Sequence, residues 1–287
     1  MGEVTVILPR TIDQAVAALV GTQDAVVLAG GTDLMVGMNA GRTRADSVIS
    51  LRHVEELAGW STDGDTVTIG AGVTYSRLLD GPLATLVPGL AHAARTVGSP
   101  QIRNAGTIGG NLATASPAGD TLPVLAALDA VVCCAGAGGP REVPFPDFVI
   151  GPKANSLGVD ELITGVRVPV AAGPQDYLKV GVRNAMVIAM VSVALVVDLD
   201  ARRVAVAIGS AGPTPRRAPD AEAWVAGHLD WGDRSIPDPR TAGTFGAMVA
   251  EASLPIDDHR GTAAYRRHAV GVLARRALGR AFPGAPR

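Results

Sequence analysis

Residues 101–123, QIRNAGTIGGNLATASPAGDTLP, decide how the rest of the sequence is interpreted. The stretch has only two charged side chains, Arg103 and Asp120. It contains too many Gly, Ser, Pro and Asn residues for a core helix, and it is too apolar for a flexible linker. We therefore expect an ordered loop across residues 101–120.

Two adjacent glycines lie in this stretch. Gly109 and Gly110 lack β-carbons, so a ligand can approach the backbone closely. The hydroxyl and amide side chains around them come from Thr107, Asn111, Thr114 and Ser116. Backbone N–H groups beside such side chains suit phosphate oxygens, whereas Asp120 would repel a phosphate and suits a sugar hydroxyl. From this stretch alone, a glycine-rich turn between packed elements is an equally good interpretation.

A second glycine pair lies in residues 25–41, AVVLAGGTDLMVGMNAG. Residues 25–29 predict a strand, and Gly30 and Gly31 end it. A strand, a Gly-Gly turn and a helix N-terminus together form an anion site. The pattern differs from the dinucleotide fingerprint of doubly wound folds, because it has no G-x-G-x-x-G and no acidic residue on a strand about 20 residues later.

The helix after this turn has signals at both ends. Thr32 and Asp33 can cap a helix that begins near Leu34, and Gly41 is placed to end it. Asp33 would repel a phosphate, so we expect its side chain to point away from the ligand and to hold the turn.

Three motifs in this order carry a family resemblance: residues 29–33 (AGGTD), 107–111 (TIGGN) and 115–120 (ASPAGD). The chain resembles the FAD-binding medium subunit of molybdenum hydroxylases, a family that includes the flavoprotein subunits of carbon monoxide and xanthine dehydrogenases. The resemblance covers essentially the whole chain, and the order of the two Gly-Gly motifs is specific to the family.

The resemblance implies an α+β fold. An FAD-binding domain of the vanillyl-alcohol-oxidase (PCMH) type is expected over residues 1–170, in two subdomains of about residues 1–55 and 56–170. A small α/β domain, like the C-terminal domain of the CO dehydrogenase flavoprotein, is expected over residues 176–287.

The resemblance also assigns cofactor-binding residues. Both Gly-Gly loops would wrap the FAD pyrophosphate, through Ala29, Gly30, Gly31, Thr32, Asp33, Thr107, Ile108, Gly109, Gly110 and Asn111. Thr114 and Asp120 match positions that contact ribityl or ribose groups. Ile163 matches an aliphatic position near the isoalloxazine ring, with ordinary strand core as the alternative. Lys179 matches a lysine close to the flavin, with a surface lysine as the alternative.

A function follows from the family and from what the chain lacks. Family complexes oxidise a substrate at molybdopterin in a large subunit and pass electrons through [2Fe–2S] clusters of a small subunit to FAD, which serves an external acceptor. We expect no catalytic acid–base pair here, and non-covalent FAD because no histidine lies near either loop. The alternatives are a free-standing FAD-dependent oxidoreductase and a pure FAD-binding or assembly module.

The composition excludes several other classes of partner. The 287 residues are 47% apolar and 18% charged, and the formal net charge is −2. A weakly acidic chain with 3% aromatic residues is not typical of nucleic-acid binding. No apolar stretch reaches the ~18 residues of a membrane span, and the N-terminus has no signal-peptide layout. We therefore expect a cytoplasmic protein.

The cysteines and histidines predict no metal centre in this chain. Cys133 and Cys134 are the only cysteines, and an iron–sulfur cluster usually needs about four thiolates. We expect them to be buried structural thiols. The five histidines have no ligand spacing: His53, His92, His228, His259 and His268.

The remaining pattern predicts the order of elements. Residues 1–55 predict a small β-α-β-α-β unit with a capping box at residues 11–14. A long helix is expected over residues 83–97, and residues 170–175 mark the domain boundary. Residues 186–197 form an apolar run that fits either a buried helix or a buried strand.

Basic residues suggest where a partner subunit could bind. Residues 265–282 predict a final helix whose arginines face solvent or another subunit: Arg266, Arg267, Arg275 and Arg276. Arg103 and Asn104 lie beside the second Gly-Gly loop and are candidates for the edge of an interface. The alternative is that Arg103 braces the loop.

Overall fold

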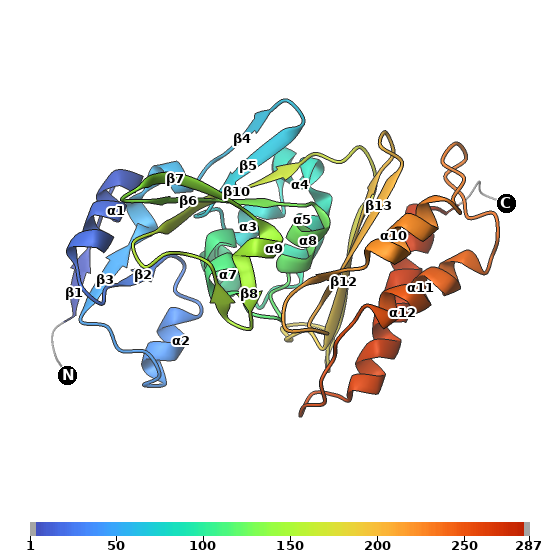
Figure 1. Cartoon of the computed structure of the whole chain (residues 1–287). Helices are drawn as coiled ribbons and strands as arrows, with labels where there is room; N and C mark the ends of the chain where they lie inside the picture. Colours follow the sequence, from blue (N-terminus) through green and yellow to red (C-terminus); the bar gives the residue numbers. More distant parts are fainter. Residues whose placement is uncertain (1–3, 284–287) are drawn as a thin grey trace.

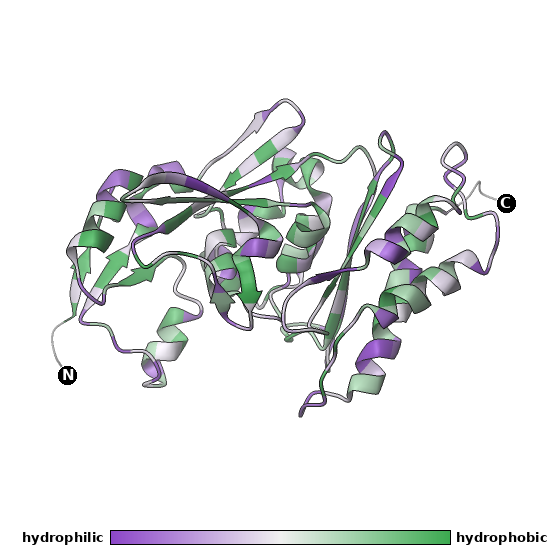
Figure 2. Ribbon diagram, viewed as in Figure 1, coloured by the Kyte–Doolittle hydropathy of each residue, from purple (hydrophilic) through white to green (hydrophobic). Residues whose placement is uncertain are grey.

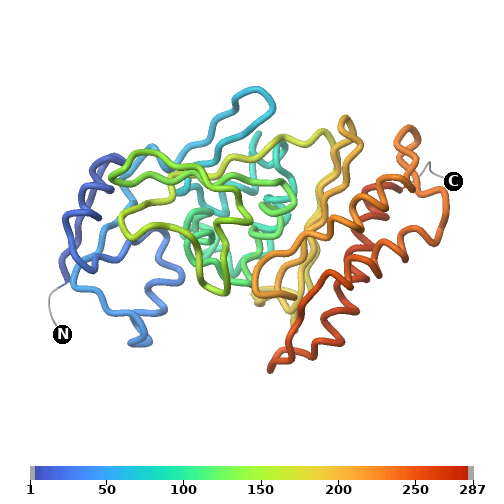
Figure 3. Tube along the Cα trace, viewed as in Figure 1, coloured from blue at the N-terminus to red at the C-terminus, as the bar shows by residue number. Residues whose placement is uncertain are grey.

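Three sheets, arranged in chain order, form the framework of the molecule (Figure 1). The computed structural model describes residues 4–283. The chain runs from one end of the molecule to the other (Figure 3). The mixed helix-and-sheet fold predicted from the sequence is confirmed.

The N-terminal sheet is parallel, with the order β1-β3-β2. Its unit contains β1 (Thr5–Ile7), α1 (Ile12–Gly21), β2 (Val26–Leu28), α2 (Leu34–Asn39) and β3 (Ser47–Ser50). The Thr11 hydroxyl accepts a hydrogen bond from the Gln14 N–H at 3.1 Å, so the predicted cap is confirmed. The Gln14 side chain accepts from the N–H of Arg10, one residue earlier than in a capping box. Gly41 ends α2 with φ +66°.

A five-stranded antiparallel sheet follows, in the order β4-β5-β10-β6-β7. Its strands are β4 (Trp60–Asp63), β5 (Thr66–Gly70), β6 (Val131–Gly136), β7 (Gly139–Pro144) and β10 (Leu162–Pro169). Two 3-10 helices precede it, η1 (Leu51–His53) and η2 (Glu55–Leu57). A small hairpin consists of β8 (Val149–Gly151) and β9 (Ala154–Asn155).

Short helices connect the strands of this second sheet. They are α3 (Tyr75–Leu78), α4 (Gly81–Leu86), α5 (Pro88–Arg95), α6 (Pro100–Ala105), α7 (Ile108–Thr114), α8 (Leu122–Ala127) and α9 (Phe145–Phe148). The prediction of a loop across residues 101–120 is wrong, because α6 and α7 occupy most of this stretch. Ile108 and Leu112 are fully buried, so packing of their side chains outweighs the low helix propensity of glycine. Pro88 likewise divides the long helix expected over residues 83–97.

The C-terminal region combines a four-stranded antiparallel sheet with three helices on its outer side (Figure 1). The strands are β11 (Gln175–Val180), β12 (Val191–Asp198), β13 (Arg203–Gly209) and β14 (Arg216–Arg217). The helices are α10 (Pro219–Ala226), α11 (Thr241–Glu251) and α12 (Ala263–Ala281). No helix within residues 4–283 is long and apolar enough to cross a membrane.

Strand β12 is buried on both faces, which explains why residues 191–197 are apolar apart from Ser192 (Figure 2). The first part of the apolar run, residues 186–190, precedes the strand, and Met186 and Ile188 are exposed, so the expected buried element is wrong there. Ala194 and Val196 belong to the core shared with the FAD-binding part of the chain. Val193 and Leu195 belong to a second core with α10, α11 and α12. Because alternate residues of a strand point to opposite faces, one strand connects the two cores.

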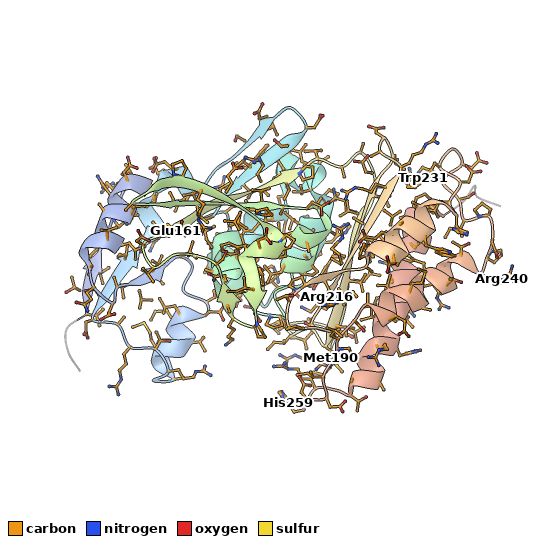
Figure 4. All side chains as sticks on the ribbon, viewed as in Figure 1. Glu161, Met190, Arg216, Trp231, Arg240 and His259 are labelled. Carbon is orange, nitrogen blue, oxygen red and sulfur yellow. The ribbon has the colours of Figure 1, made fainter. Side chains whose placement is uncertain are left out.

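Arg266 is buried rather than solvated, so that expectation is wrong. Its guanidinium donates to the Met190 and Ser210 carbonyl oxygens at 2.7 and 2.9 Å and to Asp258 at 2.6 Å. Figure 4 shows Met190 and His259 near the beginning of α12, where these contacts lie. Arg267, Arg275 and Arg276 are exposed, as expected.

Candidate cofactor site

A cavity of about 760 Å³ lies between the N-terminal sheet, α7 and the start of β10. Most of the predicted site residues line it: Ala29, Gly30, Gly31, Thr32, Asp33, Thr107, Gly109, Gly110, Asn111, Thr114 and Ile163. Ile108 is instead part of the core. Asp120 and Lys179 lie outside this lining.

The first Gly-Gly turn supplies a run of unbonded backbone amides. Gly31 has φ +73°, a conformation that glycine adopts readily. The carbonyl oxygens of Gly31 and Asp33 accept hydrogen bonds from helix α2, each at 3.0 Å. The N–H groups of residues 30–34, however, have no acceptor within the described part of the chain. Such a run can bind an anion.

The predicted side-chain cap at this turn is wrong. Asp33 is the residue before α2, but its carboxylate accepts no hydrogen bond from the helix. Asp33 is exposed and is one of the residues that line the cavity. The turn is therefore held by backbone contacts, and the carboxylate remains free to meet a ligand hydroxyl.

The amides of the second Gly-Gly segment are already used. The N–H groups of Ile108 and Gly109 donate to the carbonyl oxygens of Val73 and Ala71 at 3.0 and 2.9 Å. The N–H of Gly110 donates to the Thr107 hydroxyl at 3.0 Å. The expected run of free amides is absent here among the described residues, and only the first segment provides one.

The glycines differ in what surrounds their missing side chains. A β-carbon on Gly30 would lie 1.8 Å from the Ala105 carbonyl oxygen, so the first turn packs directly against the chain before α7. A β-carbon on Gly109 would lie 2.5 Å from that of Ala71. A β-carbon on Gly110 would meet only the Thr107 hydroxyl, at 3.1 Å. Gly110 is thus the glycine of this second segment that leaves space in the cavity.

The polar side chains of α7 are held in place by neighbours. The Thr114 hydroxyl donates to the Gly110 carbonyl oxygen at 2.8 Å. The Thr121 hydroxyl donates to Asn111 Oδ1 at 2.5 Å. Both contacts fix side chains that line the cavity.

Asp120 and Lys179 form a buried ion pair. Lys179 Nζ donates to Asp120 Oδ2 at 2.8 Å and to the Thr96 carbonyl oxygen at 3.1 Å. The Tyr177 hydroxyl donates to Asp120 Oδ1 at 2.6 Å, and burial followed by the charge of Asp120 raises the pKa of Tyr177 well above its ordinary value. The surface alternative for Lys179 is wrong, because 7% of its side chain is exposed. The network joins the loop after α7 to β11.

Ile163 lies on β10 at an irregularity in the sheet. The pairing of β10 with β6 shifts register between Ile163 and Gly165. Ile163 is 6% exposed and lines the cavity, so it is both core and cavity wall. Glu161, labelled in Figure 4, also lines the cavity and accepts from Arg141 at 2.6 and 2.7 Å.

Several other residues that line the cavity carry no recognisable signal in the sequence. Tyr75 and Arg52 contribute an aromatic ring and a cation to the cavity. Tyr75 follows Thr74, whose hydroxyl caps α3 by accepting from the Arg77 N–H, and nothing in the sequence placed the Tyr75 ring beside the second Gly-Gly segment. Arg103 donates to the Val97 and Gly98 carbonyl oxygens at 2.9 and 3.0 Å, which supports its role as a brace.

The described residues contain no group of three or more His, Cys, Asp or Glu side chains that could hold a metal ion. Cys134 is buried, as expected, while Cys133 is partly exposed. Burial raises the pKa of both thiols. Neither cysteine lines the cavity.

Two family models match the chain. The FAD-binding domain of molybdopterin dehydrogenases matches residues 2–171, and the CO dehydrogenase flavoprotein C-terminal domain matches residues 176–281. The glyceraldehyde dehydrogenase medium chain of Sulfolobus acidocaldarius is 33% identical over 96% of this chain and 97% of that protein. The nicotine 6-hydroxylase medium subunit of Paenarthrobacter nicotinovorans is 32% identical over 94% of each chain.

Solved structures agree with these sequence matches. A chain of the Cu,Mo-CO dehydrogenase superposes with a TM-score of 0.89 at 29% identity, covering 99% of both chains. A chain of quinoline 2-oxidoreductase from Pseudomonas putida 86 has the same fold, with a TM-score of 0.89. The chain therefore belongs to the FAD-binding medium subunits of molybdenum hydroxylases, the family that its Gly-Gly motifs resemble.

Proposed function

We propose that the cavity holds one non-covalent FAD, and that this chain passes electrons from the [2Fe–2S] clusters of a small partner subunit to an external acceptor. A large partner subunit would carry molybdopterin. Membership of the family makes the chain an FAD-dependent oxidoreductase subunit. Bound FAD supplies the electron-transfer chemistry, while the protein positions the cofactor.

The unbonded amides of residues 30–34 carry this proposal. A buried or half-buried N–H without an acceptor is costly, and a run of them suits the two phosphates of FAD. Gly110 supports the same placement, because its missing side chain leaves space beside α7. The cavity volume of about 760 Å³ is of the size that binds cofactors and ligands.

Other residues would contact the rest of the cofactor. We place the pyrophosphate against the backbone of Ala29, Gly30, Gly31, Thr32 and Asp33. Thr107, Gly109, Gly110 and Asn111 would line the other wall, which Ile108 supports from the core. Thr114 would serve ribityl or ribose hydroxyls, and Ile163 would lie beside the isoalloxazine ring. Asp120 and Lys179 are paired outside the cavity lining, so a contact of Asp120 with a sugar hydroxyl and of Lys179 with the flavin stay predictions from the resemblance.

The division into domains and the cellular location are further proposals. A division between residues 170 and 175 falls between β10 and β11, and the ranges of the two family models support it. A cytoplasmic location and an interface edge at Arg103 and Asn104 stay predictions from the sequence.

Anaerobic reduction tests the proposed relay. The isolated chain, loaded with FAD, is mixed with purines, aldehydes or carbon monoxide, and the visible flavin absorbance is followed. We expect no bleaching until the molybdopterin and iron–sulfur subunits are added with the substrate of the complex. Bleaching of the isolated chain at a useful rate would instead identify a free-standing flavin oxidoreductase.

A further inference from the structure

The Tyr75 hydroxyl has no hydrogen-bond partner in the described part of the chain. Tyr75 is the first residue of α3, is 6% exposed and lines the cavity. The other buried tyrosine, Tyr177, donates its hydroxyl to Asp120. The hydroxyl oxygen is not among the buried side-chain atoms of the described chain that lack a partner, so it faces the open space of the cavity, where a ligand can supply the acceptor.

Tight packing fixes the ring of Tyr75 in the cavity wall. Its N–H donates to the Gly106 carbonyl oxygen at 3.0 Å. A β-carbon on Gly106 would lie 2.8 Å from Cε2 of the ring, so the glycine makes room for it. Thr74 pairs with Thr107 across the same contact. The hydroxyl is therefore held beside α7 before any ligand arrives.

The charges around the ring keep its hydroxyl protonated. Burial, and then the charges of Asp120 and Asp33, raise the pKa of Tyr75 above its ordinary value. The group is therefore a hydrogen-bond donor at any physiological pH. Tyr75 lines the same cavity as residues 30–34, whose backbone amides are unbonded, and Gly106 adjoins both Gly30 and the Tyr75 ring.

We propose that the Tyr75 hydroxyl donates a hydrogen bond to a pyrophosphate oxygen of FAD. This inference rests on the proposed function. An anionic oxygen is the strongest available acceptor for a neutral hydroxyl, and the unbonded amides of residues 30–34 define where that anion binds. Tyr75 is thus a positioning residue for the cofactor.

Titration of the full-length apo-protein tests the proposal. FAD and riboflavin, which lacks the pyrophosphate, are titrated into the wild type, Tyr75→Phe and Tyr265→Phe. Tyr265 is 47% exposed on α12 and provides a matched loss of one phenol hydroxyl. We expect Tyr75→Phe to weaken FAD binding by about ten-fold and to leave riboflavin binding unchanged. Tyr265→Phe should bind both like the wild type.

Thermal unfolding provides a second measurement. Without FAD, Tyr75→Phe should unfold at about the same temperature as the wild type, since the lost hydroxyl makes no hydrogen bond within the described chain and faces the cavity. With FAD, the wild type should gain more stability than the variant. A less stable apo variant would show that the hydroxyl has a partner within the protein and would overturn the proposal.

Two binding results would also overturn it. Equal FAD affinity of wild type and Tyr75→Phe would show that the hydroxyl makes no contact with FAD. An equal loss for FAD and riboflavin would place the contact away from the pyrophosphate. A wild-type apo-protein that is folded but binds no FAD would contradict the proposed function itself, which separates that failure from this one.

Discussion

The two Gly-Gly segments look alike in the sequence but do different things in the structure. Around Gly30 and Gly31, five consecutive backbone N–H groups, residues 30–34, are free of acceptors in the described chain. Around Gly109 and Gly110, the amides donate to Val73, Ala71 and Thr107. The first segment therefore offers hydrogen-bond donors, and the second offers space.

The difference also separates glycines that serve packing from those that serve a ligand. The Ala105 carbonyl oxygen leaves no room for a side chain at position 30, and Ala71 leaves none at position 109. Both glycines are therefore needed for packing, whether or not a cofactor is bound. Gly110 has no comparable protein neighbour. A Gly-Gly motif alone therefore does not identify which of its residues faces a ligand.

Replacing Gly30 should have the largest effect. In Gly30→Ala, the new β-carbon would lie 1.8 Å from the Ala105 carbonyl oxygen, so the turn and the chain before α7 must separate. We expect a loss of about 3 kcal/mol in the free energy of unfolding and no detectable FAD binding. Urea unfolding and FAD titration measure both, and near-normal binding would show that the contact is dispensable.

The buried ion pair between Asp120, in the loop after α7, and Lys179 should be nearly as important for folding as Gly30. Asp120→Asn leaves the Lys179 ammonium group buried without its opposite charge. The free energy of unfolding should fall by roughly 3 kcal/mol, and Asp120→Asn combined with Lys179→Met should recover part of it. A loss below about 1 kcal/mol would be typical of an exposed pair and would contradict this account.

Gly31→Ala should have an intermediate effect. Gly31 has φ +73°, and a β-carbon would approach Leu28 and Met35 at 3.1 and 3.2 Å. We expect a loss of about 1–2 kcal/mol in the free energy of unfolding and weaker FAD binding, because the unbonded amides would be displaced. Unchanged FAD affinity would show that their arrangement does not matter.

Gly110→Ala should change the free energy of unfolding least, and it should raise that free energy where the other substitutions lower it. Gly110 lies within α7, where alanine is favoured over glycine by up to ~1 kcal/mol. The apo-protein should become slightly more stable, while FAD binding weakens by about ten-fold because the side chain occupies the cavity. Gly109→Ala is the control, since its contact with Ala71 predicts destabilisation. Similar behaviour of both variants would remove the distinction between them.

Much of the fold followed from local signals. The N-terminal β-α-β-α-β unit was predictable because Thr11 and Gly41 mark helix ends through their own chemistry. The helices α6 and α7 were not, because burial of Ile108 and Leu112 by distant residues outweighs local propensity. The burial of Arg266 was equally hidden, since its partners are Met190, Ser210 and Asp258.

The candidate site was predictable in its residues but not in its bonding. Most predicted residues line one cavity, yet which amides are unbonded depends on where Val73 and Ala71 fall in space. The pairing of Asp120 with Lys179 also joins residues 59 apart in sequence. Tyr75 was missed because a single tyrosine after a helix cap carries no signal of an unpaired hydroxyl.

The most direct test of the account is the FAD content of the folded chain. The purified apo-protein is saturated with FAD, freed of excess cofactor by gel filtration and precipitated with acid, and flavin is measured in the supernatant and the pellet. We predict one FAD per chain, all of it in the supernatant as intact dinucleotide. A folded chain that retains no flavin, or flavin that stays in the pellet, would contradict it.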